Sequence, residues 1–116
     1  MASDNNIVLV FKNNGMGITE MPSLQGALAK TFLTLTAEMT PLPKVICFYT
    51  EGVKLACEGS PVLGELIGLE RSGVRLVLCQ TCLDTLQLRE QVRVGIIGGM
   101  SDIITSMWAA DKVLMI

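Results

Sequence analysis

The chain contains no histidine, and this absence excludes several kinds of site. Nucleophile pairs of the Ser-His-Asp and Cys-His types both need an imidazole, as does any metal site with a histidine ligand. Acid–base chemistry near neutral pH must therefore come from a perturbed cysteine, lysine or carboxylate, or from an α-amino group.

Charge and aromatic residues are also scarce. Charged residues make up 17% of the chain, aromatic residues 4%, and the net charge is −2. The basic residues form no stripe, which argues against nucleic-acid binding. No apolar run approaches the ~20 residues of a membrane helix, and no signal peptide follows the polar start at residues 1–6. We therefore expect a cytoplasmic protein that does not bind membranes, in which the four cysteines are thiols, catalytic groups or metal ligands rather than structural disulfides.

Short apolar runs rich in β-branched residues alternate with helical patterns along the 116 residues. The run Ile7-Val8-Leu9-Val10-Phe11 is continuously apolar, as in a strand covered on both faces. Helix starts are expected at Ser23, at Ser60-Pro61, after the third strand and at Ser101. Strands are predicted at 7–11, 44–49, 74–78, 92–97 and 113–116. This order predicts one α/β domain spanning residues 1–116, with a mostly parallel five-stranded sheet between helical layers.

Sites in such sheets form beyond the carboxyl ends of the strands. Four loops qualify here, at 13–17, 50–54, 79–82 and 98–100. Their glycines can let the backbone approach a ligand, or can only make sharp turns. The candidate binding residues in these loops are Gly15, Met16, Gly52, Lys54, Gln80, Thr81, Gly98, Gly99 and Met100. Lys54 could support an anionic sulfur or be a solvated surface lysine, and the two methionines could border a soft sulfur or selenium site or simply fill gaps.

The Cys79-Gln80-Thr81-Cys82 sequence directly follows the third predicted strand. Thr81 and Asp84 have the spacing of a capping box, which places Cys82 at the first helical position and Cys79 at the strand end facing the helix start. Such a position favours the thiolate, the nucleophilic form of cysteine. We therefore expect Cys79 to be the most reactive thiol. The alternative is that both cysteines are small residues closing a tight turn.

The remaining cysteines have no such motif. Cys47 lies mid-strand between apolar neighbours and is expected to be inert, and Cys57 is interpreted as structural. A four-cysteine zinc site needs two knuckles, whereas this sequence has one. We therefore expect neither a bound metal nor a cofactor.

The residues Gly73-Val74-Arg75-Leu76-Val77-Leu78-Cys79, followed by a short helix, resemble the strand-end cysteine region of the DsrE-like sulfur-relay subunits. The ending Ala109-Ala110-Asp111-Lys112-Val113 is also similar to the last helix and strand of that family. The nearest resemblance is to the carboxyl-terminal domain of YedF-type proteins, which carry the label of selenium metabolism. It is carried by residues 48–55, by Glu58-Gly59-Ser60, by residues 79–84, by Val94-Gly95 and by Met100-Ser101-Asp102.

This resemblance implies a flavodoxin-like three-layer α/β/α sandwich that assembles into trimers or hexamers. It also implies that Cys79 carries a persulfide, with Cys82 resolving or shielding it, and that a TusA-like sulfur-carrier protein is a partner. The TusA-like domain with which YedF-type proteins usually begin is missing from this sequence.

The sequence is compatible with three functions. The first is a carrier of sulfur or selenium that works through Cys79 and Cys82. The second is a small-ligand-binding module without catalysis, in which the cysteines only line a pocket. The third is a purely structural oligomer, since half of the residues are hydrophobic and the mean hydropathy of +0.51 exceeds what one small domain readily hides.

Overall fold

The computed structural model describes residues 6–116. Strands and helices alternate, as the sequence predicted. The strands are β1 (Ile7–Phe11), β2 (Val45–Phe48), β3 (Arg75–Cys79), β4 (Ile96–Gly98) and β5 (Lys112–Met115). The α-helices are α1 (Pro22–Thr36), α2 (Leu63–Arg71), α3 (Gln80–Thr85) and α4 (Met100–Ala109). Two 3-10 helices, η1 (Thr50–Ala56) and η2 (Arg89–Gln91), complete the order.

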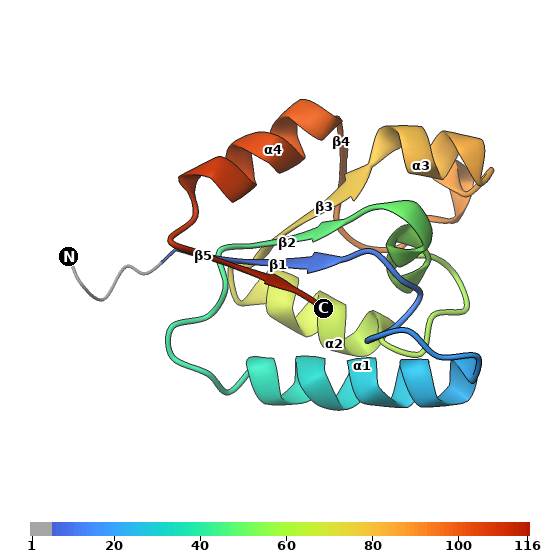
Figure 1. The fold of residues 1–116 in the computed structure, drawn as a ribbon, viewed down its shortest axis with the longest axis horizontal. Coiled ribbons are helices and arrows are strands. Elements are labelled where there is room, and N and C mark those ends of the chain that lie inside the picture. Colours follow the sequence, from blue (N-terminus) through green and yellow to red (C-terminus); the bar gives the residue numbers. More distant parts are fainter. Residues whose placement is uncertain (1–5) are drawn as a thin grey trace.

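The five strands form one all-parallel sheet in the order β4-β3-β2-β1-β5. Helices α1 and α2 lie on one face of the sheet, α4 lies on the other, and α3 stands at the carboxyl end of β3 (Figure 1). This arrangement is a flavodoxin-like α/β sandwich, which confirms the predicted fold class. The sheet is fully parallel, because each strand reaches the next through a crossover.

The core is built from the strands that the sequence marked as continuously apolar. Val8, Val10 and Phe11 are fully buried. The Phe11 ring stacks on the Phe48 ring of β2 at a centroid distance of 5.7 Å and meets the Phe32 ring of α1 edge-on at 6.2 Å. The central strands are therefore held on the α1 side by aromatic packing, and this fixes the carboxyl ends of β1 and β2 next to each other.

Several helix starts differ from the sequence prediction. Helix α1 begins at Pro22 rather than after a Ser23 cap, and α4 begins after Gly99 rather than Ser101. Helix α2 begins at Leu63, because the Ser60 hydroxyl accepts the Val62 N–H at 3.1 Å and so holds a turn before the helix.

Strand β4 is shorter than the predicted run at 92–97. The Arg93 N–H donates to the Ala56 carbonyl at 2.9 Å, and Gly95 adopts a φ of 86°. The backbone therefore joins the β3 ladder only from Ile96 onward.

Part of the surface is apolar. Met100, Ile104 and Trp108 recur every four residues on α4 and form one exposed stripe, with 87% of Trp108 accessible. No helix within residues 6–116 is both long enough and apolar enough to cross a membrane.

Candidate functional site

The two cysteines of the CxxC sequence lie together at the start of α3. Cys79 is the last residue of β3 and the N-cap of α3, which makes Cys82 the third helical residue. The predicted Thr81 cap is therefore wrong: the helix starts two residues earlier because the chain turns directly out of the strand. A side chain at the N-cap points toward the third helical residue, so this register brings the two thiols next to each other.

The two thiols differ in their access to solvent. Cys79 is 2% exposed, whereas Cys82 is only partly buried. Cys82 opens onto a cavity of ≈ 220 Å³ that is lined by Thr50, Glu51, Thr81, Cys82, Thr85 and Leu86. An external reactant can therefore reach the sulfur of Cys82, while Cys79 stands behind it.

Thr50 supplies the closest polar contact of Cys82. Its backbone N–H donates a hydrogen bond to Cys82 Sγ at 3.0 Å, and its hydroxyl donates to the Lys12 carbonyl beyond β1. Thr50 reaches this position with a φ of 47°, in the left-handed region that residues other than glycine rarely enter. Backbone strain of this kind is found where the surrounding structure fixes a functional geometry. Here it aims a donor at a sulfur 32 residues away in the sequence.

The pKa of the Cys82 thiol is raised above its ordinary value, mainly because burial disfavours the thiolate. The N–H of Thr50 opposes this shift by stabilising the anion. A hydrogen bond with the Cys79 thiol and the negative charge of Glu51 both raise the pKa further. Cys82 is therefore mainly a neutral thiol at pH 7, and a small set of neighbours controls its ionisation.

These causes predict the effect of removing the Glu51 charge. Because that carboxylate raises the pKa of Cys82, Glu51→Gln should lower the pKa and increase the thiolate fraction at pH 7. We expect the alkylation rate of Cys82 to rise about two- to threefold at pH 7 and the profile of rate against pH to move to lower pH. Alkylation rates measured from pH 6 to 10, with Glu90→Gln as the control, test this. A profile that moves to higher pH would contradict the assignment.

The other two cysteines belong to the core. Cys47 is fully buried in β2, and burial raises its pKa to about 11. Cys57 is 2% exposed, and its thiol donates to the Val53 carbonyl at 3.3 Å. Across residues 6–116, no three cysteine, aspartate or glutamate side chains gather in a way that could hold a metal ion.

Only some of the predicted binding residues lie near the cysteine pair. Thr81 lines the Cys82 cavity, and Gly52 lies in η1 two residues after Thr50. Gly52 is buried so tightly against β1 that a side-chain carbon there would collide with the Phe11 carbonyl. Its role is thus to let η1, and with it Thr50, lie against the strand. Gln80, the first residue of α3, is exposed.

The remaining predicted residues serve other contacts. Met16 donates its N–H to the Gln25 carbonyl at 3.1 Å, and Gly15 packs against the same residue of α1. Lys54 lines a separate cavity of ≈ 220 Å³ that includes Cys57.

The loop after β4 serves α4. Gly98 packs closely on Val77 and Asp102, the Gly99 N–H donates to the Asp102 carboxylate at 3.0 Å, and Met100 is exposed. None of these residues lines the Cys82 cavity.

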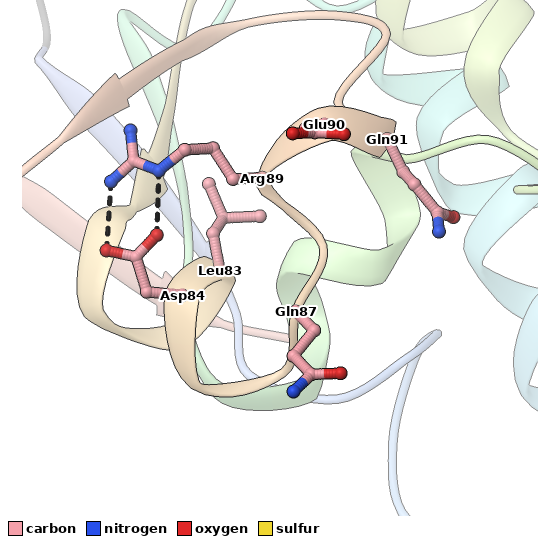
Figure 2. Close-up of a pocket in the computed structure, with 6 residues that line it drawn as sticks. All are labelled: Leu83, Asp84, Gln87, Arg89, Glu90 and Gln91. Atoms are coloured by element: carbon pink, nitrogen blue, oxygen red, sulfur yellow. Dashed lines mark hydrogen bonds and ion pairs between the residues drawn. The ribbon is translucent and has the colours of Figure 1, made fainter.

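A second, larger cavity lies on the far side of α3. It measures ≈ 490 Å³ and is lined by Leu83, Asp84, Gln87, Arg89, Glu90 and Gln91. Figure 2 shows Asp84 and Arg89 facing each other across two hydrogen bonds, of 2.7 and 2.9 Å. This ion pair lowers the pKa of Asp84 through the hydrogen bonds from Arg89. The predicted capping role of Asp84 is replaced by this pairing.

Sequence reasoning missed the two residues that most affect Cys82. Thr50 and Glu51 stand in a loop that was identified as a candidate, but neither was singled out. The left-handed backbone of Thr50 cannot be recognised from residue type or spacing. The same holds for the hydrogen bond from its N–H to a sulfur distant in the sequence. The only available signal was position, since the ends of β2 and β3 are adjacent in the sheet.

Comparisons with known proteins address the fold. No protein-family model matches the chain, and no curated protein matches it in sequence. Among solved structures, the YchN protein from E. coli superposes with a TM-score of 0.71 at 22% identity, covering 97% of this chain and 99% of that one. The protein of unknown function MTH1491 from Methanobacterium thermoautotrophicum gives 0.70 at 17% identity, covering 97% and 100% of the two chains.

A third structure, the conserved protein of unknown function BT1422 from Bacteroides thetaiotaomicron, gives a TM-score of 0.64 at 16% identity. It covers 100% of this chain and 99% of that chain. All three superpositions extend over nearly the whole length of both chains. The chain therefore shares its fold with these three proteins.

Proposed function

We propose that the protein is a cytoplasmic sulfur carrier that holds sulfane sulfur as a persulfide on Cys82, with Cys79 as its second thiol. The observation that carries the proposal is the hydrogen bond from the Thr50 N–H to Cys82 Sγ, at 3.0 Å, beside an open cavity. Carrier chemistry needs a sulfur that a donor can reach and a fixed dipole that stabilises its anion. Cys82 has both. The exposed fraction of only 2% argues against Cys79 as the point of entry, although the family resemblance favoured it.

Loading requires no metal or redox cofactor. The Cys82 thiolate attacks the terminal sulfur of a donor persulfide, the sulfur–sulfur bond of the donor breaks, and the donor leaves as a thiolate. The new Cys82 persulfide then extends into the cavity formed with Thr81, Thr85 and Leu86. Removing the sulfur by an acceptor thiol is the same exchange in reverse.

Incubation with glutathione persulfide tests the proposal. In the Cys79→Ala variant one sulfur atom, about 32 Da, should be added to the protein, and Cys82→Ser should show no such gain. Cys57→Ala is the matched control, because it deletes a thiol that does not line the Cys82 cavity. Undiminished loading of Cys82→Ser would contradict the assignment to Cys82.

The resemblance to YedF-type proteins extends the proposal to selenium, which undergoes the same exchange. It also supports a TusA-like protein as donor or acceptor. Transfer of radiolabelled sulfur between a purified TusA-like protein and this protein, lost in Cys82→Ser, is the expected result. If small persulfides load the protein but no sulfur passes between it and the TusA-like protein, the TusA-like protein is not its partner.

The cavity of ≈ 490 Å³ behind α3 supports a second candidate, the small-ligand-binding module. The Gln87 and Gln91 amides at that cavity offer donors and acceptors, while Asp84 and Arg89 are paired with each other (Figure 2). A metabolite that raises the melting temperature equally in the wild type and in Cys82→Ser would favour this function. A shift that requires Cys82 would favour the carrier.

We also propose that the protein forms a homo-oligomer, a trimer or hexamer by resemblance, through the apolar stripe of Met100, Ile104 and Trp108. Placing charge there should oppose association, because a charged group is costly to bury in an interface. We expect the double variant Ile104→Glu, Trp108→Glu to have a smaller mass by light scattering than the wild type. Arg71→Glu at the exposed end of α2, on the other face of the sheet, should leave the mass unchanged. A monomeric wild type at micromolar concentration would contradict this proposal.

A further inference from the structure

The relative burial of the two thiols suggests a reaction beyond carriage. Cys82 meets solvent, whereas Cys79 lies behind it as the N-cap of the same helix. The Cα atoms of residues three positions apart in a helix lie about 5 Å from each other, within the Cα separation that a disulfide spans. Burial keeps external thiols away from Cys79. A sulfur atom on Cys82 is already beside Cys79 and needs no path through solvent to reach it.

We propose that Cys79 discharges the Cys82 persulfide as hydrosulfide and closes a reversible Cys79–Cys82 disulfide. This inference rests on the proposed function, because it needs sulfane sulfur on Cys82. The product of this reaction is hydrosulfide. The protein would then reduce and release sulfur in addition to passing sulfane sulfur onward.

The reaction balances without an external oxidant. Cys79 sulfur attacks Cys82 Sγ, the inner atom of the persulfide, and the bond to the outer sulfur breaks. The electron pair of that bond leaves with the outer sulfur of the persulfide anion, which takes the Cys79 proton and departs as hydrosulfide. The two cysteines together lose two electrons, and the sulfane sulfur gains them. A dithiol reductant must then reopen the disulfide before the next cycle.

The geometry favours attack on the inner sulfur over transfer of the outer one. The Thr50 N–H holds Cys82 Sγ at 3.0 Å, and Cys79 is the N-cap three residues before it, so the persulfide atom nearer to Cys79 is the inner sulfur. The open cavity beside Cys82, which Thr85 and Leu86 help to line, gives the outer sulfur room and access to solvent. The leaving group therefore has a way out while the attacking thiol remains enclosed.

The test compares the wild type with Cys79→Ala after exposure to glutathione persulfide and removal of the excess without reductant. Acid-quenched intact masses and released sulfide are followed with time. Cys79→Ala should retain the gain of about 32 Da. The wild type should instead fall to about 2 Da below its reduced mass and release one sulfide for each disulfide formed. We expect its persulfide to be at least about tenfold shorter-lived than that of Cys79→Ala, because the attack is intramolecular.

The outcomes separate the two proposals. If Cys79→Ala gains no sulfur at Cys82, the proposed function fails. If Cys79→Ala loads and the wild type retains its persulfide equally long with no disulfide, the carrier stands and the discharge reaction is overturned. Cys79→Ser, which preserves the side-chain size, replaces Cys79→Ala if that variant does not fold. Cys57→Ala should behave as the wild type throughout.

Discussion

Cys82→Ser is expected to abolish nearly all alkylation of the native protein at neutral pH. The other thiols are inaccessible, since Cys47 is fully buried and Cys57 and Cys79 are each 2% exposed. Alkylation requires both a reagent path and a thiolate, and burial removes both at Cys47, where it raises the pKa to about 11. We expect the total labelling rate to fall at least about tenfold.

Limited iodoacetamide treatment followed by peptide mass mapping measures this loss. Cys57→Ser is the matched control and should label like the wild type. Labelling of Cys47 or Cys57 ahead of Cys82 in the wild type would show that the exposure assigned to the thiols is wrong. Unfolding in urea should make all four cysteines reactive, which checks that their protection comes from the fold.

Gly52→Ala is expected to cause the largest loss of stability. A methyl group at this position would collide with the carbonyl oxygen of Phe11, so η1 must move away from β1. Overpacking against fixed backbone costs about 3 kcal/mol of unfolding free energy. The same movement displaces Thr50, so the alkylation profile of Cys82 should change as well.

Gly64→Ala in α2 provides the matched control, because nothing lies within 4 Å of a side-chain carbon there. Replacing this helical glycine by alanine should raise the free energy of unfolding by about 0.5–1 kcal/mol. Urea unfolding monitored by circular dichroism gives both values. Equal stabilities for the two variants would contradict the close approach of η1 to β1.

The fold could be predicted from the sequence because its strands are simple. The apolar run Ile7–Phe11 and the runs around Ile46 and Val77 could only be covered strands, and parallel strands need helical crossovers. The boundaries were harder to predict. Ser60, Thr81 and Ser101 are all good capping residues, yet local hydrogen bonds and the exit from β3 place the helix starts elsewhere.

The candidate site could be predicted only in part. The CxxC spacing identified the pair, because it depends on residue type and on neighbours in the sequence. The order of the two thiols depends on the helix register: moving the cap from Thr81 to Cys79 encloses Cys79 and exposes Cys82. The donor to the sulfur comes from Thr50, and only the pairing of β2 with β3 brings that residue near.

The position of the added sulfur shows which of the two thiols carries it. The protein is loaded with glutathione persulfide, blocked with an alkylating reagent and digested, and the peptide carrying residues 76–89 is sequenced by mass spectrometry in the Cys79→Ala and Cys82→Ser variants. We expect one additional sulfur on Cys82 of Cys79→Ala and none on Cys82→Ser. Sulfur on Cys79 of Cys82→Ser, with an unmodified Cys82 in Cys79→Ala, would contradict it.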